Sequence, residues 1–418
     1  MSTASAETIK TTQRADRAVL RPLVEQYLAH AQSPVMAERR DQWRRLNDLD
    51  MSRPPVWVRG GRFWEEIPEA QIVECEDPFL RRHETRLRRA LHQLSFGDDA
   101  ILEPWLSVES VYRCTGWGAN AHLVRPAEHH GAYKAEYPLT DLADIRGLRM
   151  PWHEIDESAT AAQQEKLHDA VGDLIEIDLD RAPAYRSFSS DLSTALGRLR
   201  GIENFMLDMY DAPDALHRLM AFMRDGVLAT HRQAEAAGDW GLTAHSNQAM
   251  SYGGGLADPQ PNRRGVNRSE LWAYAAAQEF TLVSPQLHEQ FLLRYQMPIL
   301  APFGAVAYGC CEDLSNKIDM LRKIPNLRRI AVAPVAHVRK CVEQIGTDYV
   351  ISYRPSPADM VCCGFDKARI RRIVGDALDV LQGTHFEITL KDIDTVQNEP
   401  DRLRRWTEIV RELVDARY

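Results

Sequence analysis

The stretch Ala305-Val306-Ala307-Tyr308-Gly309-Cys310-Cys311-Glu312-Asp313 decides the fold class, because it is a short apolar strand that ends in two thiols and two carboxylates. After it, apolar runs alternate with segments whose apolar residues recur at helical spacing. Strands are expected over 330–333, 349–352 and 387–390, and helices over 314–321, 335–345, 370–381 and 403–413. Strands that alternate with helices require parallel crossover connections, so this half of the chain is predicted to be α/β.

Polar residues follow these strands directly, and their position predicts where chemistry would take place. In parallel α/β proteins the residues after each strand gather at its carboxyl end, where barrels and open sheets place their sites. The segments 308–313, 352–357 and 391–394 would therefore meet on one face. Adjacent Cys310 and Cys311 cannot both point the same way along a strand, but at a strand end one of them can turn into the site.

The two thiols predict either a metal site or a pair of free cysteines. Thiolate is a soft ligand that suits zinc, and zinc can act as a Lewis acid that activates a thiol or an ether oxygen for group transfer. Cys310 and Cys311 are the first candidate ligands, and others would come from other strand ends. These further candidates are Glu279, Cys362 or Cys363, His245, Glu387 and Asp392. The alternative is a buried free thiol.

Two further strand ends carry side chains suited to proton transfer. The segment 241–247 favours a strand that delivers His245 as a neutral ligand or proton carrier, and a satisfied core histidine is the alternative. Lys391 and Asp392 lie where a strand meets the predicted active face, and a simple ion pair is the alternative.

A third strand end suits an anion. The segment 54–58 is a candidate strand, and it is followed by Arg59-Gly60-Gly61-Arg62. The glycines let backbone N–H groups approach a ligand, while the guanidinium groups of Arg59 and Arg62 can grip its oxygens. A flexible loop with solvated arginines is the alternative.

The remaining segments are predicted to be mostly helical. Helices are expected over 20–28, 74–94, 201–211, 213–236, 269–278 and 286–297, of which 213–236 would be the longest, and strands or strand ends over 100–105, 175–178 and 188–191. Glu128-His129-His130 is expected to be a surface loop rather than a metal site. Gly253-Gly254-Gly255 predicts a mobile loop that covers a substrate or serves as a linker.

Length and composition narrow the class of protein. The 418 residues carry a net charge of −9, which argues against a general nucleic-acid binder. There is no apolar run of about 18 residues to span a membrane, and the amino terminus has no apolar secretory segment. Seven cysteines, an odd number, do not form a disulfide framework, so a reducing cytoplasm is expected. We expect a helical lead-in over residues 1–50 and one domain over 51–418.

Several common cofactor and nucleophile motifs are missing from the sequence. It contains no P-loop, no GxGxxG fingerprint, no HExxH and no Gly-x-Ser-x-Gly. An Asp-x-His-x-x-Gly motif for cobalamin ligation is also missing. A corrinoid would therefore arrive on a partner protein.

Four stretches resemble the uroporphyrinogen decarboxylase superfamily over roughly residues 50 to 418. These are Pro55-Val56-Trp57-Val58-Arg59-Gly60-Gly61-Arg62-Phe63, then Leu199-Arg200-Gly201-Ile202-Glu203-Asn204 through Ala212-Pro213, then Val283-Ser284-Pro285, and Tyr308-Gly309-Cys310-Cys311. The resemblance implies a (β/α)₈ TIM barrel, here with an N-terminal helical extension. The superfamily includes decarboxylases and methyltransferases that work with corrinoid proteins. With Tyr308 to Asp313 and Leu390-Lys391-Asp392-Ile393, the chain looks most like a divergent, decarboxylase-like branch.

The chain departs from this family at two places. Only Arg59 and Arg62 represent the arginine-rich loop of the decarboxylases. Where the zinc methyltransferases carry His-x-Cys, this chain has Tyr308 in place of the histidine and Cys310 in place of the cysteine. The resemblance thus carries over one zinc ligand, and Cys311, Glu279 or a C-terminal carboxylate would have to complete the set.

The resulting hypothesis is a cytoplasmic methyltransferase that demethylates a small O-, N- or S-methylated substrate and passes the methyl group to a corrinoid protein. Zinc on Cys310 would polarise the leaving atom, His245 or Tyr308 would manage the proton with Asp392 nearby, and Arg59, Arg62 and Lys391 would bind the substrate. A homodimer is one expected assembly.

Two rival hypotheses remain. A metal-free decarboxylase or lyase would use Arg59, Arg62 and an aspartate such as Asp98 to stabilise a charged intermediate. A binding protein without chemistry would hold a small molecule and leave it unchanged.

Overall fold

Parallel strands form the centre of the fold. The main sheet has six strands in the order β1-β10-β9-β8-β7-β6, and a separate parallel pair joins β2 to β5. The bounds are β1 (Val56–Val58), β2 (Trp105–Glu109), β5 (Glu176–Asp180), β6 (Trp272–Ala275), β7 (Ala305–Tyr308), β8 (Leu327–Val332), β9 (Val350–Tyr353) and β10 (His385–Leu390). A short antiparallel hairpin adds β3 (His122–Val124) and β4 (Lys134–Glu136).

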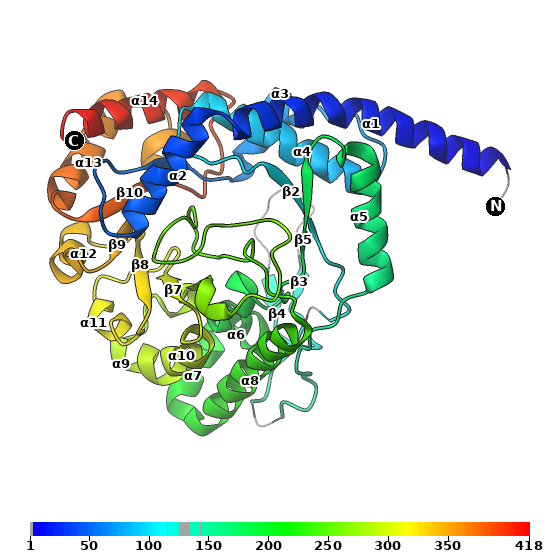
Figure 1. The fold of residues 1–418 in the computed structure, drawn as a ribbon. Helices are drawn as coiled ribbons and strands as arrows, with labels where there is room; N and C mark the ends of the chain where they lie inside the picture. The colour runs from blue at the N-terminus through cyan, green and yellow to red at the C-terminus, as the bar shows by residue number, and fades with distance from the viewer. Residues whose placement is uncertain (1–2, 115, 125–133, 143) are drawn as a thin grey trace.

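The computed structural model describes residues 3–114, 116–124, 134–142 and 144–418. Figure 1 shows the six-stranded sheet and the β2–β5 pair on opposite sides of the centre, with helices on the outside. The helices are α1 (Thr3–Ala31), α2 (Pro34–Asn47), α3 (Pro68–Gln71), α4 (Pro78–Gln93), α5 (Glu157–Val171), α6 (Leu192–Arg200), α7 (Ile202–Asp211), α8 (Pro213–Ala237), α9 (Pro285–His288), α10 (Arg294–Leu300), α11 (Ile318–Leu321), α12 (Val338–Ile345), α13 (Lys367–Leu381) and α14 (Asp401–Asp415).

Strand β7 shows why these short apolar runs are strands. All four of its residues are buried, as expected for a parallel strand that is covered on both faces. Successive side chains point to opposite faces. Ala307 therefore packs in a small cluster with Tyr274, Ala276 and Cys310, whereas Tyr308 belongs to the large core under the helices.

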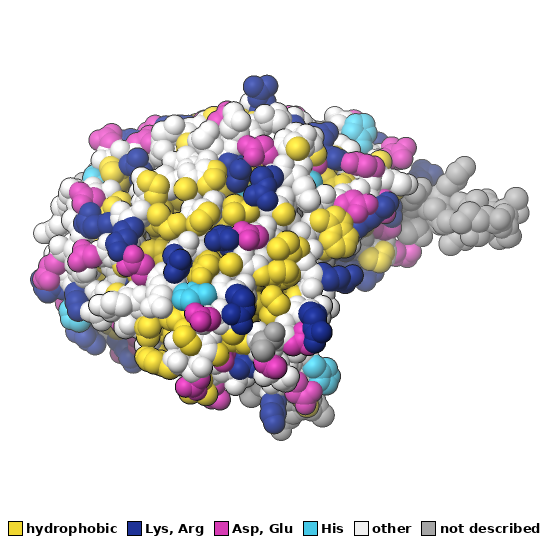
Figure 2. Space-filling view, turned by 90° about the horizontal axis from the view of Figure 1, so that it is seen from below, with side chains coloured by type: hydrophobic (Ala, Val, Ile, Leu, Met, Phe, Trp, Pro, Cys, Tyr) yellow, Lys and Arg dark blue, Asp and Glu magenta, His cyan; other side chains and the backbone are white. Residues whose placement is uncertain are grey.

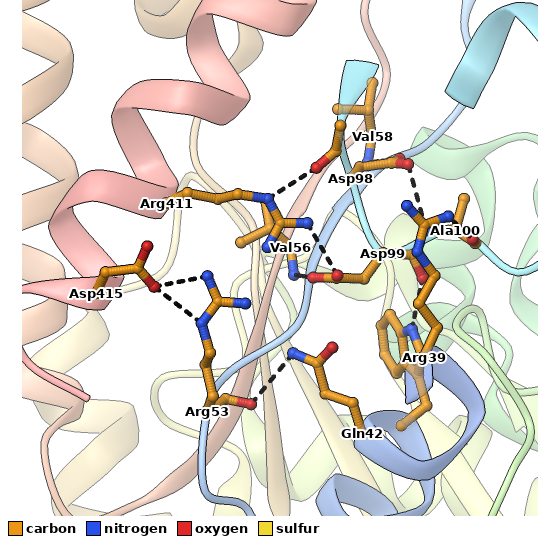
Figure 3. A network of polar contacts seen from close by, with 12 residues as sticks. Arg39, Gln42, Arg53, Val56, Val58, Asp98, Asp99, Ala100, Arg411 and Asp415 are labelled. Atoms are coloured by element: carbon orange, nitrogen blue, oxygen red, sulfur yellow. Dashed lines mark hydrogen bonds and ion pairs between the residues drawn. The ribbon is translucent and has the colours of Figure 1, made fainter. Parts of the chain in front are cut away.

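The free side of β1 is joined to the following segment by two buried aspartates (Figure 3). Asp98 accepts a hydrogen bond of 2.9 Å from the Val58 amide, and Asp99 accepts one of 2.8 Å from the Val56 amide. The Asp99 amide in turn donates to the Val56 carbonyl at 2.7 Å. Asp98 was expected to bind the substrate and stabilise its charged intermediate in the decarboxylase hypothesis, but Val58, Gln93 and the Ala100 amide occupy its oxygens. Its observed contacts are structural.

A loop fills the space between β5 and β6. The Asn262 amide donates to the Asp178 carboxylate on β5 at 2.9 Å, and the Ser246 amide donates to the Trp272 carbonyl on β6 at 3.2 Å. The predicted strand over 241–247 is wrong, because Gly241 makes only an isolated bridge to Arg264 and the segment otherwise turns. The fold is therefore α/β with a six-stranded parallel sheet and a linked parallel pair.

The prediction of alternating strands and helices after residue 305 is confirmed, whereas three further predictions before it, besides the strand over 241–247, are wrong. The segment 269–278 contains strand β6 instead of a helix, because its alanines favour a helix locally but all four strand residues are buried between layers. The segment 188–191 is a helical turn rather than a strand end. The longest helix is α1 with 29 residues, not α8 with 25. Glu128-His129-His130 lies outside the described residues.

The first 50 residues form two helices that pack on the rest of the chain. Helix α1 contributes Leu20 and Val24 to a core shared with α4, α5 and the β2–β5 pair. Helix α2 reaches the start of the main sheet, where Asn47 accepts a hydrogen bond of 2.6 Å from Arg329 of β8. Asp48, which follows α2, accepts one of 2.6 Å from the Gly254 amide. The glycine loop is thus tied to α2.

The helices and the surface bear on two classes of partner, membranes and nucleic acids. None of the described helices is long and apolar enough to cross a membrane. On the face shown in Figure 2, basic and acidic side chains are interspersed with hydrophobic ones. That face has no extended basic patch of the kind that phosphate backbones require.

We expect Asp98 to make stability depend on pH. Burial raises its pKa to about 6 from 3.8, so the folded chain binds the proton more tightly than the unfolded chain. This contribution is present below about pH 4 and is lost as the pH rises through about 6. Between about pH 4 and pH 6 the free energy of unfolding of the wild type should therefore fall relative to that of Asp98→Asn by about 3 kcal/mol. The measurement is the melting temperature of both proteins across this pH range.

The matched control is Asp376→Asn, at an exposed position on α13. Its difference from the wild type should not change across the same window. If the melting-temperature difference between Asp98→Asn and the wild type is also the same at every pH, the expected effect of burial on the Asp98 pKa is contradicted.

Candidate active site

The turn after β7 places two thiols at the carboxyl end of the sheet. Gly309 follows the strand with φ of +101°, a backbone conformation that favours glycine. A Cβ atom at this position would lie 2.7 Å from Leu314 Cδ1. The turn directs Cys310 back over the sheet, where 5% of it is exposed, while Cys311 is exposed.

The Lys391 ammonium joins both thiols to a carboxylate. Its Nζ atom lies 3.3 Å from Cys310 Sγ, 3.2 Å from Cys311 Sγ and 2.5 Å from Asp392 Oδ2. The two sulfur atoms are 3.6 Å apart, and Cys311 Sγ is 3.3 Å from Asp392 Oδ2. Asp392 has φ of +56°, so the chain after β10 adopts a sparsely populated conformation to hold this arrangement. We call these four residues the thiol cluster.

The thiol cluster favours one thiolate. The hydrogen bond from Cys311 lowers the pKa of Cys310 to about 5, and the charges of Lys391 and Arg354 add to this effect against the cost of burial. The same hydrogen bond raises the pKa of Cys311. The pair therefore holds one proton at neutral pH, and that proton is on Cys311. A thiolate of this kind is the reactive form of cysteine.

The backbone around Cys310 is held from two sides. The Glu312 carboxylate accepts hydrogen bonds of 2.7 Å from the amides of Cys310 and Ala277. The Arg354 guanidinium donates to the Cys310 carbonyl at 2.6 Å. Burial raises the pKa of Glu312. These contacts hold the Cys310 backbone in place and do not involve its sulfur atom.

Two arginines and a tyrosine complete the surroundings of the thiolate. Arg59 follows β1 and donates to the Gln248 side-chain oxygen. Burial lowers the pKa of Arg59, and the charge of Arg354 lowers it further. Tyr274 on β6 places its hydroxyl 3.3 Å from the Gly309 carbonyl, and its hydrogen bond to Cys310 helps to lower the thiol pKa.

Five of the residues selected from the sequence thus come together. Cys310, Cys311, Lys391 and Asp392 are in direct contact, and Arg59 lies close enough for their charges to affect it. Their roles in catalysis remain predictions.

The other selected residues lie elsewhere. Arg62 pairs with Asp394 at 2.5 Å on the exposed rim. Glu279 accepts a hydrogen bond of 2.5 Å from Ser193 and lines a cleft that no residue of the thiol cluster lines. Cys362 ends a helical turn over 358–362 and packs against the main core. No described contact joins any of these three to the thiols.

Tyr308 and His245 were expected to manage a proton, but both point away from the cluster. The Tyr308 hydroxyl donates to Gln296 at 2.8 Å and is 2.9 Å from His288 Nε2, so it faces the helix layer. His245 accepts a hydrogen bond from the amide of Trp272, the first residue of β6, at 3.2 Å. It therefore lies at the amino end of the sheet. Burial lowers its pKa to about 4, so it is neutral there.

The thiol cluster does not fit the expected zinc. Among the described residues, no group of three or more His, Cys, Asp or Glu side chains is arranged to hold a metal ion. The Lys391 ammonium is within hydrogen-bond distance of both sulfurs and of Asp392. The position between these donors is already occupied by a cation.

Three contributing residues were missed by sequence reasoning. Arg354 directly follows β9 and lies in the segment 352–357, which was expected on this face, but it was not singled out in the way that Lys391 after β10 was. Tyr274 was missed because its segment was predicted to be a helix. Gln248 has φ of +61° in an irregular loop, and no pattern in the sequence indicates such a position.

A large cleft reaches Tyr274 through Phe188, although none of the four residues of the thiol cluster lines it. Its volume is about 920 Å³, and Phe188 in its wall contacts Tyr274 edge-on with ring centroids 4.7 Å apart. Aromatic side chains supply much of its lining, namely Tyr112, Trp117, Tyr137, Tyr185 and Phe188. A small molecule in this cleft would therefore meet both aromatic rings and polar side chains, among them Glu109, Arg198 and Glu279.

Comparison with known proteins supports the fold. No model of a known family matches the sequence, and no curated protein matches it. A solved methyltransferase from Methanosarcina mazei is similar in structure, with a TM-score of 0.51 over 90% of this chain and 98% of that one. The sequences are 13% identical. At this identity, the similarity establishes a shared α/β architecture.

We expect the charge of Lys391 to keep Cys310 ionised. Replacing Lys391 with Met should raise the thiol pKa from about 5 towards its ordinary value of 9.0. Alkylation of Cys310 by iodoacetamide near pH 6 should then slow about tenfold, because only the thiolate reacts. Tandem mass spectrometry of the labelled peptide distinguishes the two adjacent cysteines.

Lys391→Arg is the control, because it keeps the positive charge and should retain most of the alkylation rate. If the alkylation rate of Cys310 depends on pH in the same way in Lys391→Met and in the wild type, the Lys391 ammonium does not lower the pKa of Cys310.

Proposed function

We propose that the protein is a methyltransferase that demethylates a small O-, N- or S-methylated substrate, and that the Cys310 thiolate receives the methyl group first. The observation that carries this proposal is the low thiol pKa of Cys310 beside Lys391 at the carboxyl end of the sheet. A partly buried thiolate is a strong nucleophile that stays ionised at neutral pH.

In the first step, Cys310 Sγ attacks the methyl carbon of the substrate. A sulfur–carbon bond forms, the bond from carbon to the O, N or S atom breaks, and the electron pair leaves with that atom. Where the leaving atom becomes negative, Lys391 and Arg59 stabilise the charge before it takes a proton from water. Cys311 keeps its proton, because its pKa is raised.

In the second step, the methyl group moves from Cys310 to an acceptor. A nucleophilic acceptor supplies the electron pair for the new bond to the methyl carbon, the carbon–sulfur bond breaks with its pair left on sulfur, and the Cys310 thiolate is restored. We propose that the acceptor is a corrinoid on a partner protein. This part rests on the resemblance of the chain to the uroporphyrinogen decarboxylase superfamily, which includes methyltransferases that work with corrinoid proteins. Because the Asp-x-His-x-x-Gly motif is missing from this chain, the corrinoid would be carried by a partner.

We also propose that the strands form one closed (β/α)₈ barrel. In support, eight of the described strands are parallel members of the two sheets. Asp98 and Asp99 connect β1 to the segment before β2, and Asn262 connects β5 to the loop before β6. A cytoplasmic location is proposed because all seven cysteines are free.

Zinc has no step in this mechanism. With the residues arranged as they are, Lys391 would have to leave the thiol cluster before a metal could bind both sulfurs. The lysine supplies a positive charge beside the thiolate, although a point charge on nitrogen cannot coordinate an ether oxygen as zinc does.

A second candidate function is decarboxylation of a small carboxylic acid without a metal. The observation that favours it is the pair of arginines near Cys310, since Arg59 and Arg354 have no carboxylate partner within 4.0 Å among the described residues. Carbon dioxide release without methylation of Cys310 would support this candidate. Methylation of Cys310 without release of carbon dioxide would support methyl transfer.

We expect Cys310→Ser to abolish methyl transfer and Cys311→Ser to retain it. Loss of the thiolate should lower the rate at least about a hundredfold, because a serine hydroxyl is not ionised here. In the second variant the new hydroxyl would still donate a hydrogen bond to the Cys310 sulfur, so most activity should remain. The measurement is incubation with a panel of methylated donors and no acceptor, followed by tandem mass spectrometry.

The expected product carries one added methyl group on Cys310. Methyl transfer that persists in Cys310→Ser, or a methyl group found on Cys311 alone, would overturn the proposed step.

A further inference from the structure

Arg354 is a buried cation that forms no ion pair with a carboxylate in the described part of the chain. Only 2% of it is exposed, and its guanidinium donates to the Cys310 carbonyl at 2.6 Å, the Gly309 carbonyl at 3.4 Å and the Ser352 hydroxyl at 3.1 Å. All three acceptors are neutral. The Cys310 thiolate and Asp392 interact with Arg354 through their charge, but among the described residues neither makes a hydrogen bond to its guanidinium. Buried charges in proteins are normally paired directly, so this arrangement favours one further anion in contact with Arg354.

Arg59 brings a second positive charge to the same place. It donates to the Gln248 side-chain oxygen, which is neutral, and lies over the Trp57 ring at 5.6 Å. Cys310 and Asp392 act to raise its pKa, yet burial and the charge of Arg354 lower it overall. The two guanidinium groups therefore repel each other, and the nearby anions do not fully compensate them.

Gln248, which accepts the hydrogen bond from Arg59, also carries a side-chain N–H donor without a partner in the described part of the chain. Its side-chain oxygen is taken by Arg59, whereas its Nε2 atom is buried and has no hydrogen-bond partner in the described part of the chain. Only 9% of the residue is exposed. Its φ of +61° is costly for a residue with a side chain, and such strain is often kept where it positions a functional group.

We infer that Arg59, Arg354 and Gln248 form a binding site for a carboxylate group of the substrate, beside the Cys310 thiolate. The two guanidinium groups supply the charge, and the Gln248 amide supplies a directed N–H donor. A monoanionic carboxylate suits this site better than a dianionic phosphate, because the Cys310 thiolate and Asp392 are themselves negative. Arg62 has no part in this site, since it pairs with Asp394.

This inference rests on the proposed function and names its substrate class. The substrate is a methylated carboxylic acid whose acid group is held between the arginines. Its body lies toward Tyr274 and Phe188, which form the boundary with the aromatic cleft. An apolar or aromatic body fits that lining.

The test measures binding without turnover. Benzoate is the probe, benzamide is its neutral match and phenyl phosphate is its dianionic match. Each is titrated calorimetrically into Cys311→Ser protein, and protection of Cys310 from iodoacetamide is followed in parallel. We expect benzoate to bind and protect Cys310, with benzamide at least about tenfold weaker. Equal binding of benzoate and benzamide, or tighter binding of phenyl phosphate, would overturn the carboxylate site.

Variants then locate the site. Arg59→Met and Gln248→Gly should each weaken benzoate binding about tenfold, and Arg59→Lys should restore part of it. Glycine suits position 248 because it adopts positive φ without cost. The matched control is Arg62→Met, which should bind benzoate like the wild type. Melting temperatures confirm that each variant is folded, and binding unchanged in both folded variants would overturn the assignment.

The outcomes separate this site from the proposed function. Benzoate binding without methylation of Cys310 by any donor would leave the carboxylate site standing and would count against methyl transfer. Methylation of Cys310 by donors that lack a carboxylate, together with no benzoate binding, would leave methyl transfer standing and would overturn the site.

Discussion

The contact of the Lys391 ammonium with two sulfurs and a carboxylate is the interaction on which the candidate site depends. The hydrogen bond from Cys311 makes the largest contribution to the low pKa of Cys310, and the positive charge of Lys391 adds to it against burial, which favours the neutral thiol. The thiolate and Asp392 in turn keep Lys391 charged although it is buried. The three groups therefore hold each other in their ionised forms, and removing any one of them changes the others.

The parallel sheet explains how residues so far apart in sequence reach this contact. Lys391 follows β10 and Cys310 follows β7, and β9 and β8 lie between them in the sheet. Arg354 follows β9 and spans the interval by binding the Cys310 carbonyl. Because parallel strands all end on one face, three consecutive crossover units can deliver a nucleophile and two cations to one point.

The same geometry explains which parts of the site could be predicted from the sequence. A rule that selects polar residues after apolar runs finds Cys310 and Lys391, because strand ends depend on local pattern. It fails for Tyr308, since the face on which a strand residue points depends on the register of the whole sheet. It also fails for His245, because the alternation around it does not form a strand. Gln248 depends on a loop conformation that only tertiary contacts determine.

The departure from the zinc methyltransferase pattern fits the presence of the lysine. The resemblance places Tyr308 where those enzymes carry a histidine ligand, and in this chain its hydroxyl is committed to His288 and Gln296 in the helix layer. A metal at Cys310 would thus lack one of its usual ligands, while its thiolate would still need a positive neighbour. Lys391 meets that need without coordination, since its ammonium can approach both sulfurs at hydrogen-bond distance. A site built in this way relies on the nucleophilicity of the thiolate itself, and it favours substrates whose leaving group is already activated or can be stabilised by nearby cations.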